Sequence, residues 1–139
     1  MNEKKQAIMD VVSGFLESYS ARDLAGCMGR IAEGRALFML GTNEDEVFRS
    51  MDDLEAAFRR DFANMSDIRW GARRNIHIEN DTSLASVLVE MPISYRSNGE
   101  EVSTIFRHSF TLVKQGDEWR ICSGMASVPF SSGTYSFGS

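Results

Sequence analysis

The second half of this 139-residue chain is the part that most constrains its fold. Four strand-like runs follow one another at about 67–80, 83–96, 101–114 and 117–128, separated only by turn signals at Asn80-Asp81, Asn98-Gly99 and Gly116-Asp117. Asn-Gly is the strongest short signal for a β-hairpin. Strands this long exceed the usual ~5–6 residues, so they must twist and often carry bulges. The pattern therefore predicts a strongly curved antiparallel sheet.

Three helical segments precede these strands. The first carries one apolar stripe at helical spacing, made of Ile8, Val11, Val12, Phe15, Leu16 and Tyr19. Ser20-Ala-Arg-Asp23 is typical of a capping box that opens a second, shorter helix ending near residue 30. Ser50-Met-Asp-Asp53 predicts the start of a third helix, and short strands are expected at 35–40 and 47–49.

This order of elements predicts an α+β fold in which a cone-shaped, curved antiparallel sheet wraps around three N-terminal helices. The element order is α-α-β-β-α-β-β-β-β. Helices laid across one face of a curved sheet enclose a pocket. We expect one domain at 1–128, which suits the length of the chain, and a flexible tail at 129–139, because PFSSGTYSFGS is small, polar and aromatic.

Composition excludes several classes of function. The net charge is −5 and the few paired arginines are local, so we expect no nucleic-acid partner. No run approaches the ~20 apolar residues of a membrane span, and the N-terminus lacks the apolar core of a secretory signal. Cys27 and Cys122 form no metal or redox motif, which favours buried thiols. A cytoplasmic protein without metal or cofactor is the simplest interpretation.

Counting outward from two-residue turns predicts the pairing of the strands. Ser97 should lie opposite Glu100, Glu90 opposite Arg107, and Val89 opposite His108. The same count places His108 opposite Met125, Phe110 opposite Ser123, and Arg73 opposite Glu90. One face is then mostly apolar and should pack on the helices, while the other mixes charged, small and apolar groups. A partly covered second face indicates a dimer partner, although a single bulge would exchange the faces beyond it.

Two groups of residues are candidates for chemistry. His108 lies mid-strand among apolar neighbours, where it could act as an acid or base or simply be a core histidine. Arg73, Glu90 and Arg107 form a predicted charged seam, in which a carboxylate lies between two guanidinium groups. The seam either balances charge at a dimer interface or binds an anionic substrate, with Glu90 as a second candidate acid or base.

The predicted apolar face should also supply the wall of the pocket. Its aromatic and sulfur-containing side chains suit a flat hydrophobic ligand, although plain core packing gives the same spacing. The expected ligand-binding residues are Tyr19, Phe38, Phe58, Trp70, Arg74, Met91, His108, Phe110, Ser123 and Met125. The acidic turn at 42–46 is expected to be a solvated loop that could gate the pocket.

Two segments resemble the nuclear-transport-factor-2-like superfamily and, within it, the SnoaL-like group. FMLGTNEDEVFRSMDDLEAAFRRDF (38–62) is similar to that group's strand, Gly-Thr turn, acidic loop and third helix. RHSFTLVKQGDEWRICSGMAS (107–127) is similar to its final hairpin, with matches at Arg107, Ser109, Gly116, Trp119, Ile121 and Ser127. One departure is Met125, which stands where many relatives have a histidine.

The resemblance implies a curved α+β cone that forms a homodimer through its sheet. Members of the group include isomerases, cyclases, dehydratases, hydrolases, ligand binders and kinase association domains, so the fold alone does not choose a function. We expect a domain that binds a small apolar or aromatic ligand. The alternatives are a cofactor-independent isomerase, cyclase or dehydratase that uses His108 or Glu90, and a dimerisation module.

Overall fold

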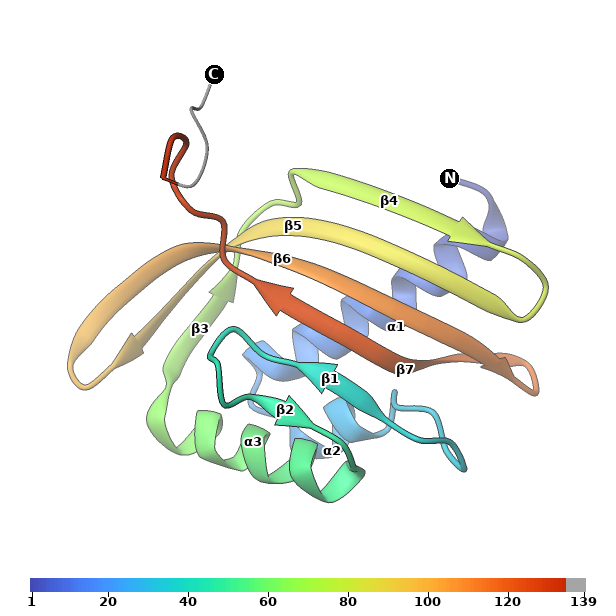
Figure 1. Ribbon diagram of the computed structural model, residues 1–139, viewed down its shortest axis with the longest axis horizontal. Helices are drawn as coiled ribbons and strands as arrows, with labels where there is room; N and C mark the ends of the chain where they lie inside the picture. The colour runs from blue at the N-terminus through green and yellow to red at the C-terminus, as the bar shows by residue number, and fades with distance from the viewer. Residues whose placement is uncertain (135–139) are drawn as a thin grey trace.

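The computed structural model describes residues 1–134. Helices α1 (Glu3–Ser20) and α2 (Leu24–Met28) come first, followed by strands β1 (Phe38–Leu40) and β2 (Val47–Phe48) and by helix α3 (Met51–Asn64). The remaining strands are β3 (Ser66–Trp70), β4 (Asn75–Asn80), β5 (Leu84–Ser97), β6 (Glu100–Gln115) and β7 (Glu118–Ser127) (Figure 1). Residues 129–134 belong to no helix or strand, and the rest of the predicted tail lies outside the described residues. No helix within 1–134 is long and apolar enough to cross a membrane.

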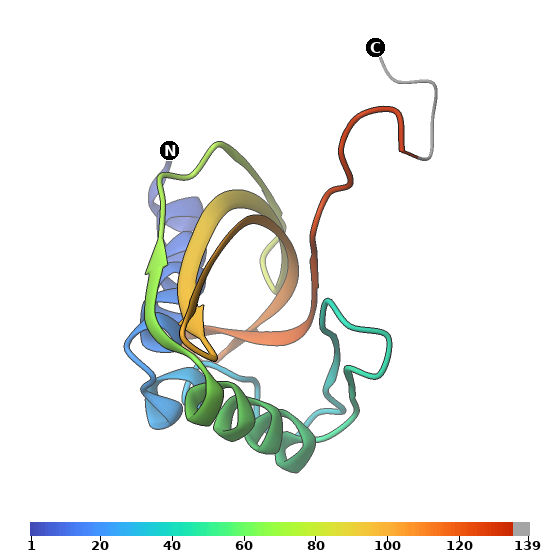
Figure 2. The ribbon, with the colours of Figure 1, turned by 90° about the vertical axis from the view of Figure 1, so that its left-hand side faces the viewer.

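The strands form one curved, mixed sheet, which agrees with the predicted α+β cone. Its order is β2-β1-β7-β6-β5-β3, with β4 also paired to β5. Neighbouring strands are antiparallel except β1 and β7, which are parallel. Figure 2 shows β5 and β6 curling strongly, with α1 along one side of the curl and α3 beneath it. The helices therefore cover the concave face of the sheet.

The predicted helix starts are partly correct. Ser50 caps α3 by accepting a hydrogen bond from the Asp53 N–H at 3.1 Å, as its capping box predicts. The prediction for Ser20 is wrong, because α1 continues through this residue and its hydroxyl donates to the Glu17 carbonyl. Asp23 caps α2 instead, since its carboxylate accepts the Gly26 N–H at 3.0 Å.

The predicted strand at 67–80 is two strands separated by an irregular segment at 71–74. Gly71 passes so close to Pro92 that a Cβ atom there would lie 3.0 Å from the proline ring, which is a tight contact for any larger residue. The alternation of faces is lost across this segment. Arg73 reaches Ser13 on α1 and does not pair with Glu90 as predicted. Asn75 lies opposite Glu90 instead, and the Arg74 guanidinium is 3.4 Å from the Glu90 carboxylate.

The long hairpin of β5 and β6 has the predicted register. Ser97 pairs with Glu100, Glu90 with Arg107, and Val89 with His108. Asn98 and Gly99 both have positive φ angles, 53° and 77°, as a two-residue hairpin turn requires.

The predicted register of β6 and β7 is correct next to their turn, but it is wrong from Thr111 towards the start of β6. A bulge between Thr111 and Leu112 shifts the pairing by one residue, so Phe110 lies opposite Gly124 and His108 opposite Ala126. Because a shift of one residue exchanges the faces of a strand, Ser123 and Met125 move to the convex face.

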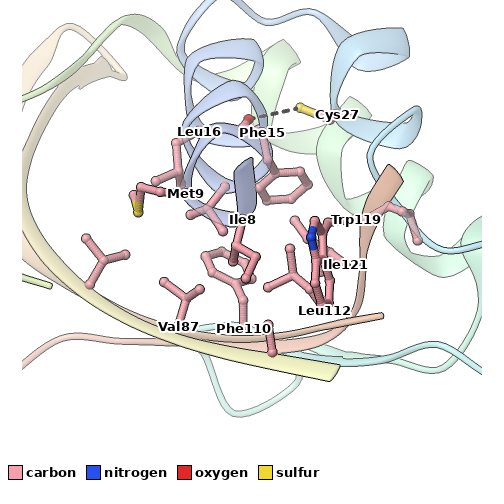
Figure 3. Packing of buried hydrophobic residues seen from close by; sticks show 14 of the residues in the cluster. Ile8, Met9, Phe15, Leu16, Cys27, Val87, Phe110, Leu112, Trp119 and Ile121 are labelled. Carbon is pink, nitrogen blue, oxygen red and sulfur yellow. Dashed lines mark hydrogen bonds between the residues drawn. The ribbon is translucent and has the colours of Figure 1, made fainter. Parts of the chain in front are cut away.

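The core fills the space between α1 and the concave face of the sheet. Ile8 and Phe15 on α1 face Val87 and Leu112 (Figure 3), and each of these side chains is at most 6% exposed. Full burial of one such side chain contributes about 1.5–3 kcal/mol. Cys27 and Cys122 are both buried and unpaired, and burial raises the pKa of the Cys27 thiol to about 12.

Candidate functional site

A cavity of about 210 Å³ opens where the core ends, between α1, α3, the β1–β2 loop and the concave face of β6 and β7. Its inner wall is made mostly of aromatic rings, and its mouth carries polar side chains from the loop and from α3. The wall includes Phe15, Tyr19, Phe58, Trp70, Phe106, His108 and Phe110. The mouth is the polar part of the lining, which is formed by Thr42, Asn43, Glu46 and Asp61.

Aromatic rings from three elements contact one another around Tyr19, the last residue of the apolar stripe of α1. Its ring lies 5.8 Å from Phe58, 5.4 Å from Phe62 and 6.2 Å from Trp70, measured between ring centroids. The Trp70 indole donates to the Leu16 carbonyl at 2.7 Å, which fixes β3 against α1. Tilted aromatic pairs at these separations are favourable, so the wall is held in place before any ligand arrives.

The Tyr19 hydroxyl donates a hydrogen bond of 2.9 Å to the Asp61 carboxylate. Burial raises the pKa of Asp61, and this outweighs the opposing effects of Tyr19 and Arg60. Burial and the nearby Asp61 charge likewise raise the pKa of Tyr19. The pair therefore places a carboxylate with strengthened basicity at the cavity.

Sequence reasoning missed Asp61, although a signal was present. Leu54, Phe58, Asp61 and Met65 share one helical spacing, so this carboxylate falls on the apolar stripe of α3. An acidic residue on a buried stripe is costly without a partner or a function.

Glu46 reaches the same mouth from the acidic turn. A Cβ atom at Gly41 would lie 2.7 Å from the Glu46 side chain, so the glycine makes room for this carboxylate. Glu46 accepts the Asn43 N–H at 2.8 Å and a bond from the Arg60 guanidinium at 3.0 Å. Arg60 also lies 3.7 Å from Asp61. The Arg60 guanidinium group is thus shared between the carboxylates of Glu46 and Asp61.

His108 lies on the inner wall, stacked on Phe110 at 5.4 Å and edge-on to Trp70 at 5.6 Å. Its side chain is buried, and Nδ1 has no hydrogen-bond partner among the described residues. Burial lowers the pKa of His108 to about 4. The imidazole is therefore neutral at pH 7, and the buried Nδ1 keeps a hydrogen-bonding capacity that no described residue uses.

The predicted ligand-binding residues are only partly brought together. Six of them line the cavity: Tyr19, Phe58, Trp70, His108, Phe110 and Met125. Met91 is packed in the core, Phe38 lies under the Arg49 guanidinium, and Ser123 and Arg74 are not among the lining residues. Met125 lines the cavity but is 46% exposed, because the bulge turns it outward.

The charged seam forms on the opposite side of the sheet with Arg74 in place of the predicted Arg73. Glu90 accepts bonds from Arg107 at 2.5 Å and from Asn75 at 3.0 Å, and Arg74 lies 3.4 Å away. The bond from Arg107 is the main cause of the lowered pKa of Glu90. Glu90 does not line the aromatic cavity, although it lines a second, more open hollow together with His77, Arg107 and His108.

Within residues 1–134, no three His, Cys, Asp or Glu side chains are arranged to hold a metal ion. The titratable side chains that line the cavity are Tyr19, Glu46, Asp61, Tyr95 and His108.

Comparison with known proteins agrees with the fold. The family model described as the SnoaL-like domain matches residues 8–131. A ketosteroid isomerase-like protein from Erwinia carotovora atroseptica superposes with a TM-score of 0.79 at 13% identity, over 94% of this chain and 100% of that one. A candidate dehydratase of the nuclear-transport-factor-2-like family from Streptomyces avermitilis gives 0.80 at 13% identity, over 91% and 97%.

A candidate scytalone dehydratase from Novosphingobium aromaticivorans gives a TM-score of 0.80 at 11% identity, over 98% of this chain and 91% of that one. No curated protein matches this chain. Identities this low establish a shared fold and leave the chemistry to the residues of the cavity.

Proposed function

The chain belongs to the SnoaL-like domain family, and we propose that its cavity binds a small apolar or aromatic ligand. The cavity itself carries this proposal: about 210 Å³ of space, walled by aromatic rings that already contact one another, with a few polar groups at the mouth. Binding sites for small molecules usually have this combination of a preformed apolar wall and few oriented polar groups.

We expect a side chain that fills the cavity to abolish ligand binding. Ala126 lines the cavity on β7, so Ala126→Phe would place a ring in the ligand space. Ser123→Phe is the matched control, because Ser123 is on the same strand but does not line the cavity. Isothermal titration with uncharged 2-naphthylmethanol should show binding to the native chain and to Ser123→Phe, and none to Ala126→Phe. Equal binding to both variants would place the ligand elsewhere.

A second candidate function is proton-transfer catalysis of the isomerase, cyclase or dehydratase type. The Tyr19–Asp61 pair favours it, since a buried carboxylate with a raised pKa is suited to act as a base near neutral pH. Proton abstraction can be followed by NMR as deuterium uptake from D₂O into the methyl group of 2-acetylnaphthalene. The native chain should accelerate uptake and Asp61→Asn should not. A rate no faster than buffer would remove this function.

We also propose a homodimer formed through the convex face of the sheet. Leu88 and Met125 flank Ser109 in one row across β5, β6 and β7 and are 54% and 46% exposed, beside the charged seam. Adjacent exposed apolar side chains of this kind support an interface. Light scattering at micromolar concentration that gives the mass of a single chain would refute the dimer.

The buried free thiols suit a reducing compartment, which supports the proposed cytoplasmic location.

A further inference from the structure

The charged side chains that line the cavity are all acidic among the described residues. Glu46 and Asp61 line it, and no lysine or arginine among the described residues does. Their shared partner Arg60 approaches from outside the lining and has a half-exposed side chain. One positive charge facing two carboxylates leaves one negative charge uncompensated at the mouth. A partly buried charge of this kind is costly unless a cation joins it.

The aromatic wall lies directly beside these carboxylates. Tyr19 contacts Asp61 through its hydroxyl, while its ring packs against Phe58 and Trp70. Ring faces attract cations, and the attraction strengthens where water is excluded. A cavity that combines aromatic rings with carboxylates is therefore electrostatically suited to an organic cation.

A second observation points independently to a ligand. His108 lines the same cavity, is 9% exposed, and keeps a buried Nδ1 that no described residue satisfies. Buried polar atoms are rarely left without a partner in folded proteins. A neutral imidazole can supply an acceptor nitrogen to an N–H group of a ligand, and its neutral state adds no positive charge that would repel a cation.

We infer that the preferred ligand is a hydrophobic amine, bound as its ammonium ion, with its apolar body against the aromatic wall and its nitrogen near Asp61 and Glu46. This inference rests on the proposed ligand-binding function and adds the charge of the ligand to it. Carboxylic acids with the same apolar body should be rejected, because the two carboxylates at the mouth would repel them.

Three probes that share one aromatic body test the charge of the ligand. They are 2-naphthylmethylamine, 2-naphthylmethanol and 2-naphthoate, each titrated calorimetrically into the native chain at pH 7. The amine should bind about tenfold more tightly than the alcohol or better, as expected for one charge-assisted contact. The carboxylate should bind more weakly than the alcohol.

Two variants assign the preference to the mouth of the cavity. Asp61→Asn should bring the amine and alcohol dissociation constants close together, and Glu46→Gln should reduce their ratio in the same direction. Asp52→Asn is the matched control, because Asp52 is exposed on α3 and does not line the cavity. It should keep the full preference. Circular dichroism verifies that each variant is folded, and either cavity variant suffices for the test.

The outcomes separate the two proposals. Alcohol binding as tight as amine binding, or a preference for 2-naphthoate, would overturn the amine inference and leave ligand binding intact. An amine preference that survives in both Asp61→Asn and Glu46→Gln would also overturn it. If none of the three probes binds, the proposed ligand-binding function fails and the inference fails with it.

Discussion

Acidification from pH 7 to pH 4.5 should lower the free energy of unfolding through His108 alone by about 2–3 kcal/mol. The unfolded chain takes up a proton on this histidine near the ordinary histidine pKa of 6.5, whereas burial lowers the folded-state pKa to about 4. Between these values the unfolded state binds more protons, so the contribution is complete above pH 6.5 and is lost as the pH falls towards 4. Urea unfolding at the two pH values measures it.

A pair of histidine variants isolates this contribution. His108→Phe keeps an aromatic ring against Phe110 and removes the titrating group, so its stability should fall by about 2–3 kcal/mol less than that of the native chain over the same interval. His77→Gln removes an exposed histidine on β4 and should retain the native loss. Other groups such as Asp61 also titrate at acid pH, but they are common to all three proteins. An equal loss in His108→Phe would contradict the burial argument.

Turn chemistry and side-chain alternation were sufficient to predict the strand pairing where the backbone is regular. The Asn98-Gly99 turn fixes a two-residue hairpin, and strict alternation then determines which residue of β5 faces which residue of β6. This is why Glu90 and Arg107 were paired correctly from sequence, and why His108 was placed on the concave face.

Alternation failed where the backbone departs from a regular strand. The turn after β4 is longer than two residues, because the Asp81 carboxylate accepts the N–H groups of Ser83 and Leu84. The pairing therefore shifts by two and brings Asn75 opposite Glu90. The bulge in β6–β7 shifts it by one and turns Met125 towards the convex face. A bulge leaves no composition signal, so a count from the turns cannot detect it.

Sequence pattern placed Tyr19 and the acidic turn at the pocket, but it could not predict the contacts among the polar residues, because these come from distant parts of the chain. Tyr19, Glu46 and Asp61 belong to α1, a loop and α3, and only the curl of the sheet brings these elements to one opening. The apolar half could be predicted, since Phe58, Trp70 and Phe110 each follow a helix or strand period. Sequence periodicity thus located the wall, whereas the chemistry depends on tertiary contacts.

Phe110→Ala should cost about 3–5 kcal/mol of unfolding free energy, the range for removing a buried aromatic side chain. Phe110 is 3% exposed, lies edge-on to Phe15 at 5.7 Å and stacks on His108. Phe106→Ala, four residues earlier on β6, is the control. Phe106 is only half-buried on the cavity wall, so its loss should be smaller in the same urea titration. Equal losses would show that Phe110 is not a core contact.

A variant at Gly124 tests the packing of Phe110 further, because Gly124 on β7 lies opposite Phe110 on β6. A Cβ atom at Gly124 would lie 2.9 Å from the Phe110 ring, so Gly124→Ala should destabilise the native chain by about 1–3 kcal/mol through overpacking. In the Phe110→Ala background the ring is gone, and the added methyl group should instead fill part of the vacated space. A double-mutant cycle should therefore give a coupling of about 1 kcal/mol or more, with the double variant more stable than the two single losses predict. Additive losses would mean that Gly124 is required for another reason than the close approach of Phe110.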